Sequence, residues 1–125
     1  GYGLSYTTFA YSDIHLSSTE MSADGELTAT VTVTNTGSRD GAEVIQLYIR
    51  DLVGSVTRPV KELKGFEKIF LKAGESRKVS FSITPELLKF YNYDLQFVCE
   101  PGDFDVMIGG NSRDVKKARF LLKGE

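Results

Sequence analysis

The sequence predicts an all-β protein, an antiparallel β-sandwich of about seven to eight short strands with one short helical turn. Three observations predict this fold. Apolar and polar residues alternate with a period of two in several segments, turn-forming residues separate these segments at fairly even spacing, and only one segment changes period. The 125 residues suffice for one hydrophobic core but not for two. A single sandwich domain is therefore expected.

The first two strands differ in how clearly they alternate. Residues 9–16 form the first strand, in which a phase slip near Ser12 indicates a bulge of the kind found on edge strands. Residues 27–34 alternate most regularly, with Leu27, Val31 and other apolar residues set between four threonines. One face of this strand is therefore expected to be dry. The threonine face can lie in solvent or against another domain.

The middle of the chain carries two further strands. Residues 35–41 are rich in turn formers and predict a hairpin loop. The strand at 42–50 has apolar residues on both faces, which is typical of a central strand. A longer connection over 51–59 leads to a strand at 63–71, in which Gly65 marks a bulge.

The last third of the chain contains the one change of period. Residues 79–83 alternate as a strand, and residues 84–88 predict a helical turn with Thr84 as N-cap and Pro85 at the first helical position. Residues 100–103 have Pro and Gly at the central positions of a type II turn. Strands at 95–99, 104–108 and 118–122 complete the predicted sandwich.

Composition and charge narrow the classes of function. The net charge of −2 offers no broad positive field, so neither nucleic acid nor a membrane is expected as a partner. Cys99 is the single cysteine, so no internal disulfide or thiolate metal site is expected. The first residues carry no export signal, and a start at Gly1 without Met indicates a piece of a longer chain.

Candidate catalytic groups are sparse. The single histidine, His15, falls on the first strand, where a structural role is expected. Solvated positions at strand ends and on outward faces are expected for five acids: Asp51, Glu62, Glu67, Asp103 and Asp105. They are too scattered for a catalytic pair and lack the dense spacing of a calcium loop. We expect no catalytic residue, metal ligand or cofactor in this chain.

Binding is the main alternative class of function. Tyr48, Tyr91 and Tyr93 are candidates for stacking on sugar rings, as in carbohydrate-binding modules with a β-sandwich fold. Trp is absent, however, and Tyr on strands usually serves packing, which is the expected role here. A protein-interaction or adhesion sandwich is a further alternative.

Several segments resemble one known family. These are residues 1–9, 31–37 with 41–44, 58–68, and 100–104 with 108–109. In this order they resemble the carboxy-terminal fibronectin type III-like domain of glycoside hydrolase family three. The most specific piece is 58–68, which reads Arg-Pro-Val-Lys-Glu-Leu-Lys-Gly-Phe-Glu-Lys. The resemblance covers essentially the whole chain, which looks most similar to bacterial periplasmic β-glucosidases.

The resemblance implies an immunoglobulin-like, fibronectin type III-like sandwich over residues 9–125, with residues 1–8 as a junction from an upstream catalytic region. In that family the catalytic residues belong to upstream domains, so this chain alone is not expected to be an enzyme. The implied role is accessory: packing on the catalytic domains of the same polypeptide and stabilising them, in the periplasm or outside the cell. An oligosaccharide near the interdomain cleft is a further implied partner.

Two segments are candidates for the interdomain contact: residues 2–8, which would adjoin the upstream catalytic region, and the loop over 51–59. The loop over 51–59 sets apolar side chains beside a cation, a composition that suits an interface better than solvent. We expect Arg58 to pair with a carboxylate of the catalytic domains. A flexible loop in solvent is the alternative. The complete set of predicted contact residues is Tyr2, Leu4, Tyr6, Leu52, Val53, Val56 and Arg58.

Overall fold

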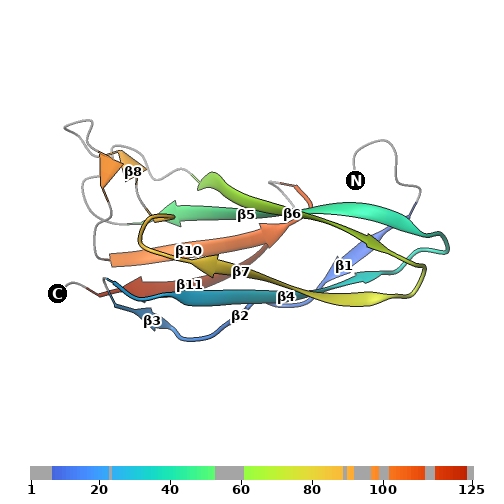
Figure 1. Ribbon diagram of the computed structural model, residues 1–125, viewed down its shortest axis with the longest axis horizontal. Helices are drawn as coiled ribbons and strands as arrows, with labels where there is room; N and C mark the ends of the chain where they lie inside the picture. The colour runs from blue at the N-terminus through green and yellow to red at the C-terminus, as the bar shows by residue number, and fades with distance from the viewer. Residues whose placement is uncertain are drawn as a thin grey trace.

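The computed structural model describes residues 7–22, 24–52, 61–88, 90–91, 97–98, 102–111 and 115–123. In these ranges the chain forms eleven β-strands, four of them only two residues long. They run along an elongated molecule and confirm the predicted all-β sandwich (Figure 1). The strands are β1 (Phe9–Tyr11), β2 (His15–Leu16), β3 (Glu20–Met21), β4 (Leu27–Asn35), β5 (Gly41–Asp51), β6 (Lys61–Leu71), β7 (Ser76–Ile83), β8 (Phe90–Tyr91), β9 (Phe97–Val98), β10 (Gly102–Gly109) and β11 (Val115–Leu122).

The strands form two sheets and one small pair. In the four-stranded sheet, β4 pairs with β7 on one side and with both β1 and β2 on the other. The five-stranded sheet has the order β3-β11-β10-β5-β6, so β5 is internal, as predicted, and β6 is an edge strand. The β8–β9 pair lies at one end of the molecule, and the β4–β5 and β6–β7 connections lie at the other (Figure 1).

The bulge predicted near Ser12 is present on the edge of the four-stranded sheet. Tyr11 lies opposite Val33 while His15 lies opposite Thr30, so four steps along the edge correspond to three along β4. Ser12 bridges the irregularity, because its N–H donates to the Thr32 carbonyl at 2.9 Å and its Oγ accepts from the Thr32 N–H at 2.8 Å. The extra residue lets apolar side chains on both sides of the break reach the core.

A second predicted bulge lies between β5 and β6. Leu47 pairs with Gly65 but Tyr48 pairs with Leu63, which leaves Lys64 as the extra residue. Because side chains alternate along a strand, this insertion brings Leu63 and Phe66 to the same face of the sheet. The bulge therefore determines which side chains β6 presents outward.

Two details differ from the sequence-based expectation. The alternating pattern did not predict β3, which pairs in parallel with β11 through Glu20 and Met21. The helical turn predicted at 84–88 is present as two overlapping hydrogen-bonded turns rather than a helix. The Leu87 N–H donates to the Thr84 carbonyl at 3.0 Å and the Leu88 N–H to the Pro85 carbonyl at 3.1 Å.

The core lies between the two sheets. The four-stranded sheet contributes the apolar face of β4 and parts of β7, and the five-stranded sheet contributes side chains of β5, β10 and β11. Phe104 and Phe120 stack with ring centroids 5.5 Å apart. Burial of each large side chain contributes about 1.5–3 kcal/mol. None of the described residues belongs to a helix long and apolar enough to span a bilayer.

Candidate functional site

One of the seven predicted contact residues lies in the described part of the chain. Leu52 is half-buried, and its N–H donates to the Asp103 carbonyl at 3.1 Å, which continues the pairing of β5 with β10 by one residue. The other six, Tyr2, Leu4, Tyr6, Val53, Val56 and Arg58, lie outside the described residues. Their role in an interface therefore stays a prediction.

The candidate acids do not all face solvent as expected. Glu67 is exposed, but Asp105 is only 2% exposed, so the expectation of a solvated carboxylate there was wrong. Arg119, opposite Asp105 on β11, donates from Nε to Asp105 Oδ1 at 3.0 Å. This hydrogen bond, with the carboxylate charge, raises the pKa of Arg119. The contact with Arg119 offsets the cost of burying the Asp105 carboxylate.

His15 is exposed on β2. Within the described ranges, no three His, Cys, Asp or Glu side chains are close enough to hold a metal ion. Of the three tyrosines considered for sugar stacking, Tyr48 is half-buried and its hydroxyl donates to Gln46 Oε1. The Tyr91 side chain and all of Tyr93 lie outside the described set. The described part of the chain thus tests sugar stacking only at Tyr48.

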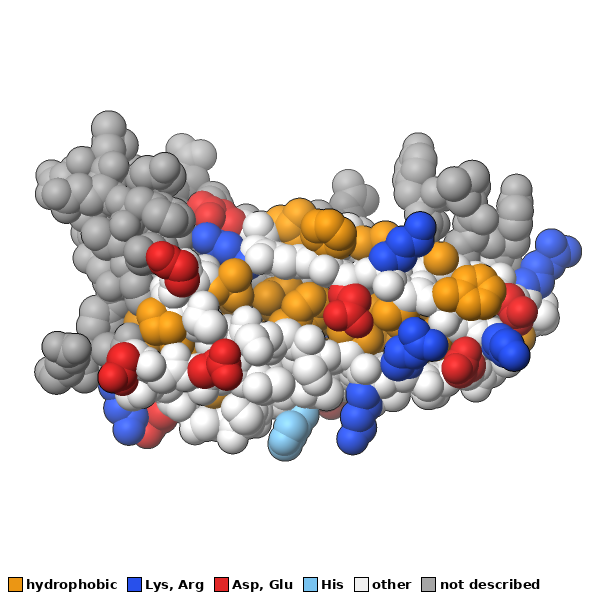
Figure 2. Space-filling model, viewed as in Figure 1, with side chains coloured by type: hydrophobic (Ala, Val, Ile, Leu, Met, Phe, Trp, Pro, Cys, Tyr) orange, Lys and Arg blue, Asp and Glu red, His pale blue; other side chains and the backbone are white. Residues whose placement is uncertain are grey.

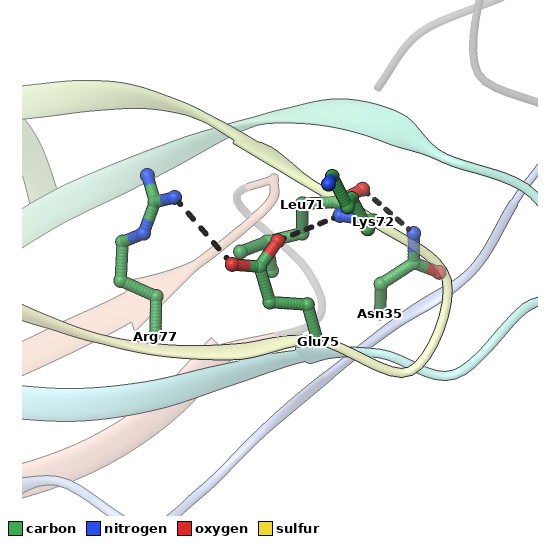
Figure 3. Close-up of polar contacts among 5 residues, drawn as sticks. All are labelled: Asn35, Leu71, Lys72, Glu75 and Arg77. Atoms are coloured by element: carbon green, nitrogen blue, oxygen red, sulfur yellow. Dashed lines mark hydrogen bonds and ion pairs between the residues drawn. The ribbon is translucent and has the colours of Figure 1, made fainter.

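The buried side chain of Asn35 has a structural role. Asn35 is fully buried at the end of β4, and its Nδ2 donates to the Leu71 carbonyl at 3.1 Å and to the Arg39 carbonyl at 2.8 Å. Beside it, Glu75 accepts a hydrogen bond from the Lys72 N–H at 2.8 Å and approaches Arg77 at 3.9 Å (Figure 3). These bonds close the β6–β7 turn, where Gly74 has φ +80°.

Asn35 also accepts two hydrogen bonds at Oδ1. The Thr7 hydroxyl donates at 2.6 Å and the Gly37 N–H at 3.0 Å. One amide therefore ties together the start of the described chain, the β4–β5 loop and the β6–β7 turn. The Asn35 amide is accordingly occupied by the fold itself.

A second buried polar group lies near the start of β5, beside the end of β10. Glu43 is buried, and the Tyr11 hydroxyl donates to its Oε2 at 3.0 Å. Burial, then the charge and hydrogen bond of Glu43, raise the pKa of Tyr11 well above its usual value. A Cβ atom at Gly110 would come within 2.6 Å of Glu43 Oε2, so glycine leaves room for this contact. Like Asn35, Glu43 holds strands together across the sandwich.

The outward side of the four-stranded sheet is a hydroxyl face. We use this term for the outward side chains of β4 and β7, which are Thr28, Thr30, Thr32, Thr34, Ser76, Lys78, Ser80 and Ser82. Cross-strand pairs bond to each other, with Thr30 Oγ1 3.0 Å from Ser80 Oγ and Thr34 Oγ1 2.7 Å from Ser76 Oγ. In Figure 2 the surface over β4 is drawn mostly in white. Large apolar side chains are absent from these eight positions.

The outward side of the five-stranded sheet is different at its β6 edge. Leu63, Phe66 and Phe70 are 53%, 69% and 55% exposed, and we call these three residues the β6 row. Their partners on β5 are Tyr48, Gln46 and Ala42, which face away from the core. Figure 2 shows hydrophobic side chains gathered over β6 along the upper edge of the molecule.

Cationic side chains accompany the β6 row. Lys68 lies between the two phenylalanines on the same face and is exposed. Arg50, also on this face, is half-buried, and its Nε is buried without a hydrogen-bond partner in the structure. Residues 63–71 were predicted as a strand, but the exposure of the row was not predicted. β6 carries apolar residues on both faces, a pattern that is equally typical of a covered central strand.

Comparison with known proteins agrees with the sandwich architecture. Residues 43–112 match the fibronectin type III-like domain family. The chain belongs to this family of β-sandwich domains. The resemblance to the domain of this kind in glycoside hydrolase family three is also confirmed, by the relatives and solved structures that follow.

The similar proteins are glycosidases much longer than this chain. The chain is 57% identical over 122 residues to a periplasmic β-glucosidase of Salmonella typhimurium, and 46% identical over 125 residues to a β-xylosidase of Formosa agariphila. Each match covers 98% of this chain but only 16% and 17% of the relative. A β-glucosidase structure from Listeria innocua, in complex with glucose, superposes with a TM-score of 0.88 at 41% identity, over 98% of this chain and 17% of that one.

Proposed function

We propose that the chain is a non-catalytic accessory domain of a β-glucosidase, which packs on the catalytic region of the same polypeptide and stabilises it. The observation that carries this proposal is the β6 row. Three large apolar side chains lie exposed on an edge strand of a chain that matches only 16% of a β-glucosidase. Exposed apolar rows on soluble domains mark interaction surfaces.

The buried polar groups also support an accessory role. Asn35, Glu43 and Asp105 each bond to groups of neighbouring strands or loops. Catalysis by a nucleophile or general base requires such groups to face a substrate instead. Residues 1–8 act in this proposal as the junction from the catalytic region, and residues 9–125 as the sandwich. The periplasm is the proposed location, since one relative at 57% identity is named a periplasmic enzyme.

A deletion experiment tests the proposed function. The full-length polypeptide and a version without this chain are compared for hydrolysis of aryl β-glucosides and β-xylosides and for thermal inactivation, beside the 125-residue chain alone. We expect the chain alone to be inactive, and its removal to shorten the half-life of activity on heating. Hydrolysis by the chain alone would contradict the proposal, as would a deletion that changes neither activity nor half-life.

A titration of the 125-residue chain distinguishes the accessory role from sugar binding. The 125-residue chain is titrated with cello-oligosaccharides and laminarin while its tyrosine fluorescence is followed. An accessory domain is expected to give no saturable change up to millimolar sugar. Saturable binding would instead favour a carbohydrate-binding module, the alternative that the aromatic residues of the sequence left open.

A further inference from the structure

The outward side of the five-stranded sheet combines two features, an exposed apolar row and an arginine whose buried Nε has no hydrogen-bond partner among the described residues. We propose that the β6 row and Arg50 together form the surface that docks on the catalytic region, and that the docked surface is apolar with a carboxylate opposite Arg50. This inference rests on the proposed accessory function and identifies the face that performs it.

The β6 row is one line of apolar side chains. The bulge at Lys64 brings Leu63 onto the face of Phe66 and Phe70, so the three side chains form one line of roughly 20 Å. All three are more than half exposed. An exposed apolar edge strand invites aggregation unless another surface covers it. The row is therefore expected to be covered in the complete protein.

Arg50 lies on the same face as the β6 row. It lies two residues beyond Tyr48, the partner of Leu63, and opposite Asp105 on β10. Asp105 already accepts a hydrogen bond from Arg119, and the Arg50 Nε is buried without a partner in the structure. A buried donor without an acceptor is costly, whereas a guanidinium binds a carboxylate in a planar, two-pronged geometry. The Nε atom is enclosed by this chain, but the Arg50 side chain is only half-buried, so a carboxylate on the docked surface would bind the exposed part of that side chain.

The charge of this face indicates which surface covers it. Among the described side chains that face outward from β5 and β6, the charged ones are Arg50 and Lys68, both positive. In a symmetric contact between two copies, each copy would bring the same cations to the interface, and like charges would face each other. An acid-bearing surface elsewhere in the polypeptide fits better. The matched glycosidases contain ample chain to supply it, because the match covers only 16% of the β-glucosidase.

Variants of the full-length polypeptide test the docking face. Phe66→Ser combined with Phe70→Ser, and separately Arg50→Gln, are compared with Lys78→Gln, which removes one cation from the hydroxyl face. The two docking variants are expected to lower the melting temperature of the full-length protein by roughly 5 °C, because buried anchor residues dominate interface energies. Lys78→Gln is expected to change it by less than about 1 °C.

The 125-residue chain with the same substitutions serves as the folding control. The phenylalanine pair is exposed there, so the melting temperature of the chain alone is expected to stay within about 2 °C. If the docking variants leave the full-length protein unchanged while deletion of the whole chain destabilises it, the accessory function stands and the docking face is wrong. If deletion itself has no effect, the proposed function fails as well.

Two further outcomes would overturn the choice of occupant. Sedimentation that reveals a dimer of the full-length protein, lost in the Phe66→Ser and Phe70→Ser variant, would assign the row to a second copy. Laminarin or cello-oligosaccharides that protect Phe66 from oxidation in the chain alone would assign it to a sugar. Neither result is expected from a surface that docks on the catalytic region.

Discussion

The two outward faces of the sandwich differ in how completely their side chains are paired or covered within this chain. On the hydroxyl face, small polar side chains of β4 and β7 pair with one another across the strands. On the β5 and β6 side of the other sheet, three large apolar side chains are exposed and the Nε of Arg50 has no partner. Both sheets are needed to enclose the one core, yet in the chain alone only the hydroxyl face is complete, with its side chains paired across the strands. The incomplete face is where we infer that the domain meets the rest of its polypeptide.

The largest expected effect on stability comes from placing a charge on the buried side of β4. Val31 is buried and faces the core, whereas Thr32 faces outward opposite Lys78. Val31→Asp should abolish folding or cost at least about 4 kcal/mol, because it buries an unpaired charge. Thr32→Asp should cost less than about 1 kcal/mol, since it places a carboxylate near a cation in solvent. Chemical denaturation of both variants measures the contrast.

A soluble Val31→Asp variant with an unchanged melting point would refute the assignment of inward and outward faces. So would equal losses of stability in the two variants. Either result would mean that the hydroxyl side of β4 is not the outward side.

A smaller effect is expected from the buried amide that closes one end of the sandwich. Asn35→Ala leaves several backbone groups and the Thr7 hydroxyl without a partner, and should cost about 3 kcal/mol. Thr34→Ala, one residue away on the hydroxyl face, removes one exposed bond and should cost within about 0.5 kcal/mol. Equilibrium unfolding in urea compares the two, and similar losses would show that the hydroxyl face is not independent of the fold.

The sequence predicted those features that depend on neighbouring residues. Period-two alternation identified the long strands, the phase slip near Ser12 and the glycine at position 65 indicated both bulges, and the segment motifs identified the family. Each of these signals is local. Backbone pleating and turn chemistry require particular residues at short spacing, whatever the rest of the chain does.

Features that depend on distant partners were not predicted. β3 is two residues long and carries no period, so its parallel pairing with β11 has no local signal. Asp105 was predicted to be a solvated acid, because its partner Arg119 is placed beside it only by the β10–β11 register. The exposure of the β6 row follows from the position of β6 at the sheet edge, which is a property of topology. Because this exposure has no local signal, the predicted contact residues did not include the β6 row. Of the residues that were predicted, only Leu52 is described.

Hydroxyl-radical footprinting of the unmodified full-length polypeptide beside the 125-residue chain tests directly whether the β6 row is covered. Oxidation rates are read by mass spectrometry at Phe66 and Phe70, with His15, exposed on the other sheet, as the internal control. We predict that both phenylalanines react in the chain alone and are protected at least about tenfold in the full-length protein, as expected for side chains buried in an interface core. His15 should react alike in both. Equal oxidation rates at Phe66 in the two proteins would show that the β6 row is not covered in the full-length protein, which would contradict the proposed docking face.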